Sequence, residues 1–115
     1  MLTMAKLGYV VLRLSQAIGD AEIGGNSREA VELWEQLGRA VDKAQKMEEP
    51  TLGKPEAITD WWESKIYLFT LALQPRAARY ATGEWVGMVE GELARAQKDY
   101  AEWQAKRREK TRNPR

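Results

Sequence analysis

Apolar residues return every three or four positions along almost the whole chain, and no segment alternates polar and apolar residues for long enough to predict a strand. This period places apolar side chains on one face of a helix. In the first segment that face comprises Met4, Leu7, Val11, Leu14 and Ile18. The periodicity therefore predicts an all-α fold, a bundle of four helices with short loops between antiparallel neighbours.

Glycines and prolines divide the pattern into helices. The stretch "GDAEIGGN" ends the first helix, and either Asn26 or Ser27 can cap the second. Asn26, with Glu29 three residues later, resembles a capping box. The stretch "EEPTLGKP" ends the second helix, because proline cannot continue a helix interior, whereas Pro55 suits the start of a third near Glu56. The second helix is expected to bury Val31, Trp34, Leu37 or Gly38, Val41, Ala44 and Met47.

The third helix is apolar on nearly every side. Its first apolar face holds Trp62, Ile66, Phe69 and Leu73, its second Trp61, Leu68 and Ala72, and Tyr67 and Leu71 fill much of the rest. A helix of this kind is buried nearly all round, so we expect it to be central or to be completed by another subunit. Pro75 predicts a kink or a break in the helix. We expect a third helix that is kinked near this residue.

The fourth helix is long. Thr82 is a candidate cap, and the helix is expected to reach about Glu109. Its inward residues are Trp85, Val89, Leu93, Ala96, Tyr100 and Trp103. We expect residues 1–109 to form a single helical domain, and residues 110–115 to form a basic tail that orders only when it binds an acidic surface.

The composition removes several functional classes. The chain has no cysteine and no histidine, so it lacks disulfides and the commonest general base and metal ligand. The stretch "GGNSRE" lacks the lysine and preceding strand of a phosphate loop. The acidic face of the second helix has no matching acidic cluster that would complete a Mg²⁺ site. We expect no enzymatic activity, no cofactor, no metal and no small-molecule substrate.

Hydropathy predicts no contact with a membrane. The most apolar run, "IYLFTLAL", is far shorter than the roughly 20 residues of a membrane helix. The opening residues lack the pattern of a secretory signal. We therefore expect a cytoplasmic protein without a signal or transmembrane segment.

Two features of the helices are candidates for partner binding. Gly83, Gly87 and Gly91 lie four residues apart, and such spacing favours close crossing of another helix, within the chain or between subunits. The alternative is that the helix begins near Glu90 and the glycines form a loop. Trp61 cannot share a helix face with Trp62, so it either contacts a partner or packs against the first helix of its own chain.

The positive charge is concentrated at one end. Residues 106–115 carry a net charge of +5, and residues 1–105 carry −4. The basic residues are Lys106, Arg107, Arg108, Lys110, Arg112 and Arg115. Part of this charge suits the C-terminal end of a helix dipole. The remainder is consistent with docking on an acidic protein surface or with contacts to a nucleic-acid backbone.

Residues 63–103 resemble the paired helices of small phage head-to-tail adaptor (connector) proteins. The residues that carry the likeness are Leu71, Ala72, Leu73, Pro75, Tyr80, Leu93, Ala94, Ala96 and Tyr100. The resemblance implies a ring of identical subunits that docks on a portal, with the C-terminal tail reaching a neighbour. It also implies a virion-associated location.

Three functions follow as expectations. The first is a non-enzymatic assembly subunit that forms homo-oligomers or docks on a protein partner through Trp61, the glycine face and the basic end. The alternative is a small helical subunit of a nucleoprotein complex, comparable to those of CRISPR effector complexes, that binds nucleic-acid backbone. The third is a helical inhibitor or regulator of another protein.

Overall fold

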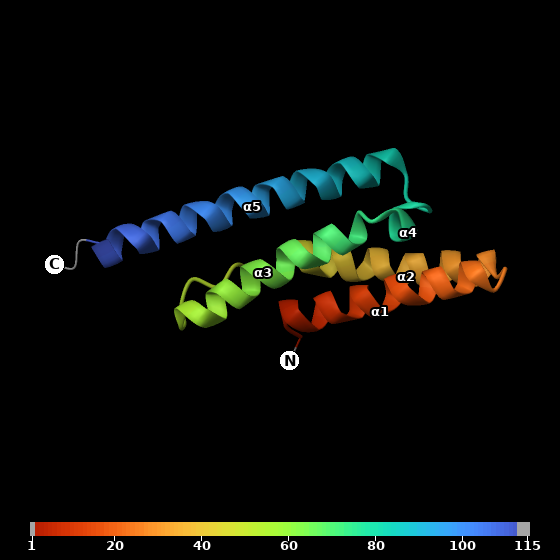
Figure 1. Ribbon diagram of the computed structural model, residues 1–115, viewed down its shortest axis with the longest axis horizontal. Helices are drawn as coiled ribbons and strands as arrows, with labels where there is room; N and C mark the ends of the chain where they lie inside the picture. Colours follow the sequence, from red (N-terminus) through yellow and green to blue (C-terminus); the bar gives the residue numbers. More distant parts are fainter. Residues whose placement is uncertain (1, 113–115) are drawn as a thin grey trace.

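The computed structural model describes residues 2–112, with the side chains of residues 2–109. Every regular element in that part of the chain is a helix, which confirms the all-α prediction. The four long helices are α1 (Met4–Ile23), α2 (Ser27–Lys46), α3 (Pro55–Ala72) and α5 (Gly83–Arg112), and α4 (Pro75–Ala78) is a single turn. Figure 1 shows α1 and α2 side by side, α3 beside them and α5 running along the length of the molecule.

Helices α1 and α2 form a tight antiparallel hairpin. Val11 of α1 and Leu37 of α2 are fully buried, as their spacing predicts. The connection places Gly25 at a φ of 75°, a conformation that side chains disfavour. The predicted cap is confirmed, because the Asn26 side-chain oxygen accepts a hydrogen bond from the Glu29 backbone N–H at 3.1 Å.

None of the helices in the described residues is long and apolar enough to cross a membrane.

Helix α3 is central, as its apolar circumference predicts. It packs against α1, α2, α4 and α5, and Phe69 is fully buried. Helix α1 packs against it at Gly8, where a Cβ atom would make an ordinary van der Waals contact, 3.7 Å from the carbonyl oxygen of Ser64. The enclosure is incomplete, because Tyr67 remains 48% exposed. The expectation that Tyr67 fills a buried face is therefore wrong.

A break in the helix, rather than a kink, occurs at Pro75: α3 ends at Ala72 and α4 begins at Pro75. The kinked third helix of the fold prediction is therefore wrong. Gln74 has extended backbone angles, and Pro75 then begins α4 as its first residue. The proline ring disfavours a helical conformation in the residue before it and supplies no N–H for a continuous helix. After the single turn of α4, the Thr82 hydroxyl accepts a hydrogen bond from the Trp85 backbone N–H at 3.1 Å, which confirms the predicted cap of α5.

Helix α5 determines the elongated shape. Its 30 residues span about 45 Å at 1.5 Å per residue, and the molecule measures 62 × 29 × 21 Å. The radius of gyration of 16.4 Å exceeds the roughly 13 Å of a compact domain of this length. The helical backbone continues to Arg112, three residues beyond the predicted end at Glu109.

The core has two parts. The larger cluster joins α1, α2, α3, α4 and the first half of α5, with Val89 of α5 fully buried. The smaller one lies between α3 and α5, where Ile58, Trp62 and Ala96 are buried. Tyr100 and Trp103 are only partly buried there. The molecule thus has a four-helix end and a two-helix end.

The structure corrects one inward residue of α2. Val31 is 38% exposed, although it was expected in the core. The buried face of α2 is centred on Leu37 and Val41. At about 100° per residue, Val31 lies roughly 120° around the helix from Leu37 and therefore at its edge. Trp34 and Trp85, also expected inside, are partly buried.

Candidate interaction site

The uncovered side of α5 carries small residues along most of its length. Val89 and Ala96 are buried against the rest of the chain, so the opposite side faces outward. We call this side the outer face; it comprises Gly83, Gly87, Gly91, Ala94, Lys98, Ala101 and Ala105, all exposed. Successive members are three or four residues apart, so they form one line along the helix.

The three glycines have no neighbour in their own chain. A Cβ atom built at Gly83, Gly87 or Gly91 would meet no atom within 4 Å. The prediction of a close helix crossing at these glycines within the chain is therefore wrong. A crossing between subunits stays a prediction. The loop alternative is wrong too, since α5 begins at Gly83.

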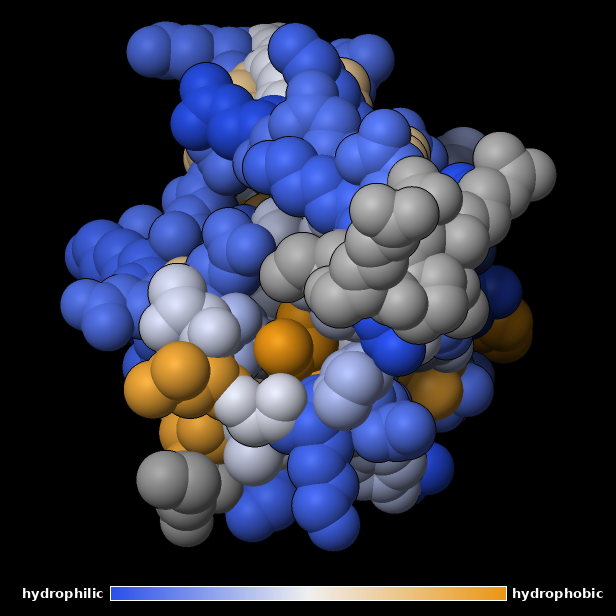
Figure 2. Space-filling model, turned by 90° about the vertical axis from the view of Figure 1, so that its left-hand side faces the viewer, coloured by the Kyte–Doolittle hydropathy of each residue, from blue (hydrophilic) through white to orange (hydrophobic). Residues whose placement is uncertain are grey.

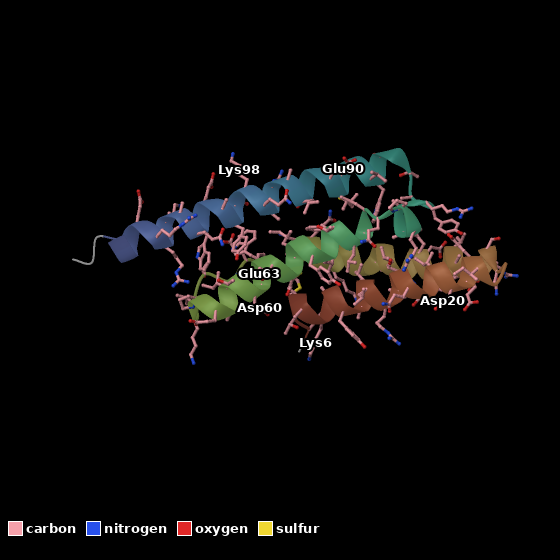
Figure 3. All side chains as sticks on the ribbon, viewed as in Figure 1. Lys6, Asp20, Asp60, Glu63, Glu90 and Lys98 are labelled. Atoms are coloured by element: carbon pink, nitrogen blue, oxygen red, sulfur yellow. The ribbon has the colours of Figure 1, made fainter. Side chains whose placement is uncertain are left out.

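Charge is unevenly distributed along α5. Residues 83–94 contain Glu84, Glu90 and Glu92 and no lysine or arginine. Residues 95–109 contain five basic and three acidic residues. Figure 3 shows Glu90 and Lys98 projecting from α5 on the side away from α3. Counted around its whole circumference, α5 therefore has an acidic first half and a basic second half.

Trp61 packs largely within its own chain. Its ring meets that of Trp62 edge to face, with centroids 4.9 Å apart, and it lies against both core clusters. It is only partly buried, so some of the ring still reaches the surface. A partner contact through Trp61 stays a prediction, restricted to that exposed part.

Lys65 was considered from the sequence only as a possible extension of the basic surface, and its contact with the aromatic rings of α3 was not predicted. Its ammonium nitrogen lies 5.0 Å from the ring centroid of Trp61, 5.8 Å from that of Trp62 and 6.0 Å from that of Phe69. These distances allow cation–π attraction. Burial lowers the pKa of Lys65 from its usual 10.5, and nearby carboxylates, Glu92 first, only partly oppose this effect. The spacing of three and four residues from these rings could have predicted the contact.

A row of stacked rings continues from there towards the end of α5. The Trp62 and Tyr100 rings stack with centroids 6.2 Å apart, and Tyr100 and Trp103 repeat that distance. The Tyr100 hydroxyl donates a hydrogen bond to the Glu63 carboxylate at 3.2 Å. Burial raises the pKa of Tyr100, and the Glu63 carboxylate adds to the effect. The row holds the second half of α5 against α3.

The basic end of α5 is exposed where the structure describes it. Lys106, Arg107 and Arg108 are exposed, and the Arg107 guanidinium lies 5.2 Å from the ring centroid of Trp103. Figure 2 views this end of the molecule, and most of its visible surface is hydrophilic. The side chains of Lys110 and Arg112, and the whole of Arg115, lie outside the described residues.

A shallow cleft of about 540 Å³ lies between α1 and α4. Gly19 leaves room for Arg76, whose Cδ would lie 3.0 Å from a Cβ atom at that glycine. Arg79 pairs with Glu22 at 3.1 Å on a neighbouring cleft wall. Asp20 and Glu22 balance the two arginines, so the cleft selects neither an anion nor a cation.

The described residues contain no group of three or more acidic side chains placed to hold a metal ion. The outer face of α5 and its basic end are two candidate surfaces for a partner, beside the exposed part of Trp61. Comparisons with protein-family models, with curated proteins and with solved structures find no match to this chain.

Proposed function

We propose that this chain is a non-enzymatic assembly subunit that docks on a neighbouring protein subunit through the outer face of α5. The observation that carries the proposal is the openness of Gly83, Gly87 and Gly91, which face nothing in their own chain. A glycine in a helix interior costs about 1 kcal/mol relative to alanine. Gly83 is the first residue of α5, whereas Gly87 and Gly91 lie in its interior. Because no packing inside the chain offsets the cost of these two glycines, contact with a second backbone would account for it.

The resemblance of residues 63–103 to phage head-to-tail adaptors supports the same class of function. Such proteins are subunits of a larger assembly, and the likeness includes Ala94 on the outer face. The exposed part of Trp61 and the basic end would add contacts at the border of the docking surface. Tryptophan and arginine are common at the energetic centre of interfaces.

Substitution of one glycine tests this proposal. We expect Gly87→Leu to abolish the concentration-dependent mass increase of the native chain in light scattering and native mass spectrometry. The matched control is Gly38→Leu, since Gly38 lies inside α2 and a Cβ atom there also meets nothing within 4 Å. A native chain that stays monomeric up to about 1 mM, and binds no partner, would overturn the proposal.

The exposed basic end favours a second candidate, binding to nucleic-acid backbone. Lys106, Arg107 and Arg108 lie about 100° apart around α5, so they present charge on several sides. If all three contact phosphates, the logarithm of the association constant falls with that of salt concentration at a slope of about −2 to −3. Replacing the three by alanine should remove this slope, and binding without salt dependence would exclude the candidate.

A further inference from the structure

The charge of the unpartnered outer side of α5 indicates which partner fits it. Glu84 and Glu90 are exposed in the first half, which has no basic residue, whereas its third glutamate, Glu92, is partly buried and pairs with Arg95. Residues 95–109 carry a net charge of +2. A second α5 that runs antiparallel would bring each acidic half against a basic half. The two helix dipoles would also be antiparallel, which is their favourable arrangement. A parallel copy would align like charges instead.

We propose that the partner is a second copy of this chain, and that two α5 helices pair antiparallel about a two-fold axis at Ala94. This inference rests on the proposed function above. In this register residue i lies opposite residue 188 − i, so Glu90 faces Lys98 of the partner twice. Figure 3 shows both side chains directed away from the bundle, where a second copy can reach them.

The sizes of the opposed residues agree with the same register. Gly83 comes opposite Ala105, and Gly87 comes opposite Ala101, so small residues meet at both of these positions. Gly91 lies beside the Lys98 of the partner and leaves room for its long side chain. All of these residues are exposed in the single chain. Small residues allow two helices to approach at or below the usual 8–10 Å.

Two kinds of like-charge contact oppose the pairing. Glu84 comes close to Glu102 of the second copy, because their numbers sum to 186 and both lie about 80° around α5 from Ala94 on the same side. Arg95 comes close to the Arg95 of the second copy near the axis. Its guanidinium already lies 3.7 Å from the Glu92 carboxylate of its own chain, which reduces the repulsion. Small side chains also bury little area, so the interface falls below the usual ~1,600 Å² of stable complexes. We therefore expect dissociation constants in the range of about 10–1,000 µM.

Single-cysteine cross-linking tests the register, because the chain has no cysteine of its own. A disulfide needs Cα atoms within about 7 Å. Ala94→Cys should therefore form a disulfide-linked dimer under mild oxidation. Gly83→Cys alone and Ala105→Cys alone should not, since each lies about 33 Å from its own copy at 1.5 Å per residue. An equal mixture of the two should cross-link.

Matched controls separate this inference from chance collisions and from the proposed function. Glu35→Cys places a thiol at an exposed position of α2 and sets the background. Cross-linking of Ala94→Cys at that background, or strong cross-linking of Gly83→Cys alone, would overturn the register. If the native chain still associates in light scattering, the proposed function survives that result. A chain that stays monomeric up to about 1 mM overturns the antiparallel pairing, and it overturns the proposed function as well if the chain also binds no partner.

Charge reversal provides an independent test by analytical ultracentrifugation. Glu90→Lys or Lys98→Glu should each weaken association about five- to tenfold, because each places like charges opposite one another. The double variant should restore association to within about twofold of the native chain. Failure of this rescue, with both single variants correctly folded by circular dichroism, would contradict the pairing of these two residues.

Discussion

The indole rings of Trp34 and Trp85 meet edge to face, with centroids 5.6 Å apart and planes at 69°. This contact joins α2 to the first turn of α5, and the Gln45 amide adds a hydrogen bond to the sulfur of Met88 in the same region. The second half of α5 is held by α3 through the stacked rings. Helix α3 is thus the main support of α5, and α2 adds to it at the first turn, which leaves the outer face free along its length.

The coupling between these two rings can be measured. We expect a double-mutant cycle with Trp34→Leu and Trp85→Leu to give an interaction energy of about 0.5–1.5 kcal/mol, the usual value for an edge-to-face pair. Urea denaturation of the four proteins gives the free energies of unfolding. Additive single effects would show that the two rings do not stabilise each other.

Burial predicts a strong contrast between two apolar substitutions. Phe69→Ala should reduce the free energy of unfolding by about 3–5 kcal/mol, because Phe69 is fully buried in α3 and leaves a cavity. Val31→Ala should change it by less than about 1 kcal/mol, since Val31 lies at the edge of α2. Equal losses in chemical denaturation would contradict the orientation of α2 described above.

The open glycines give a prediction of opposite sign. Gly87→Ala should raise the free energy of unfolding of the monomer by about 1 kcal/mol, because the added methyl group meets no atom within 4 Å. Gly25→Ala is the control and should lower it, because Gly25 has a positive φ. Denaturation at low micromolar concentration separates this effect from association. Destabilisation by Gly87→Ala would show that the face is covered within the chain.

Lys65 should make stability depend on pH. Because burial lowers its pKa below 10.5, the folded chain binds this proton less tightly than the unfolded chain. The free energy of unfolding contributed by Lys65 therefore rises with pH between the lowered pKa and 10.5. We expect Lys65→Met to show a smaller upward slope than the native chain between about pH 8 and 10. Identical slopes in urea denaturation would contradict the burial of this ammonium group.

Local signals in the sequence were sufficient for the secondary structure. The helical period, the caps at Asn26 and Thr82 and the start of α3 at Pro55 depend on residues within one turn of each other, and the structure confirms them. The break at Pro75 was within reach of the same local argument. Whether the proline kinks the helix or breaks it depends on how α5 packs back over α3.

The surfaces were harder to predict, because sequence gives the angle of a residue on its helix but not what covers that angle. Trp61 lies on a second face of α3, and only the tertiary structure shows that both core clusters cover most of it. Lys65 is polar by type, yet three rings surround it. Val31 was assigned inward because the centre of the buried stripe depends on where α1 lies.

The glycines of α5 show the same division most clearly. Their spacing of four residues is a property of the sequence alone, and it places them on one side of a helix. Whether that side meets a neighbour depends on the rotation of α5 about its axis. Burial of Val89 and Ala96 against the bundle sets this rotation, because hydrophobic burial outweighs what three glycines can gain from packing. The tertiary structure thereby leaves Gly83, Gly87 and Gly91 facing outward.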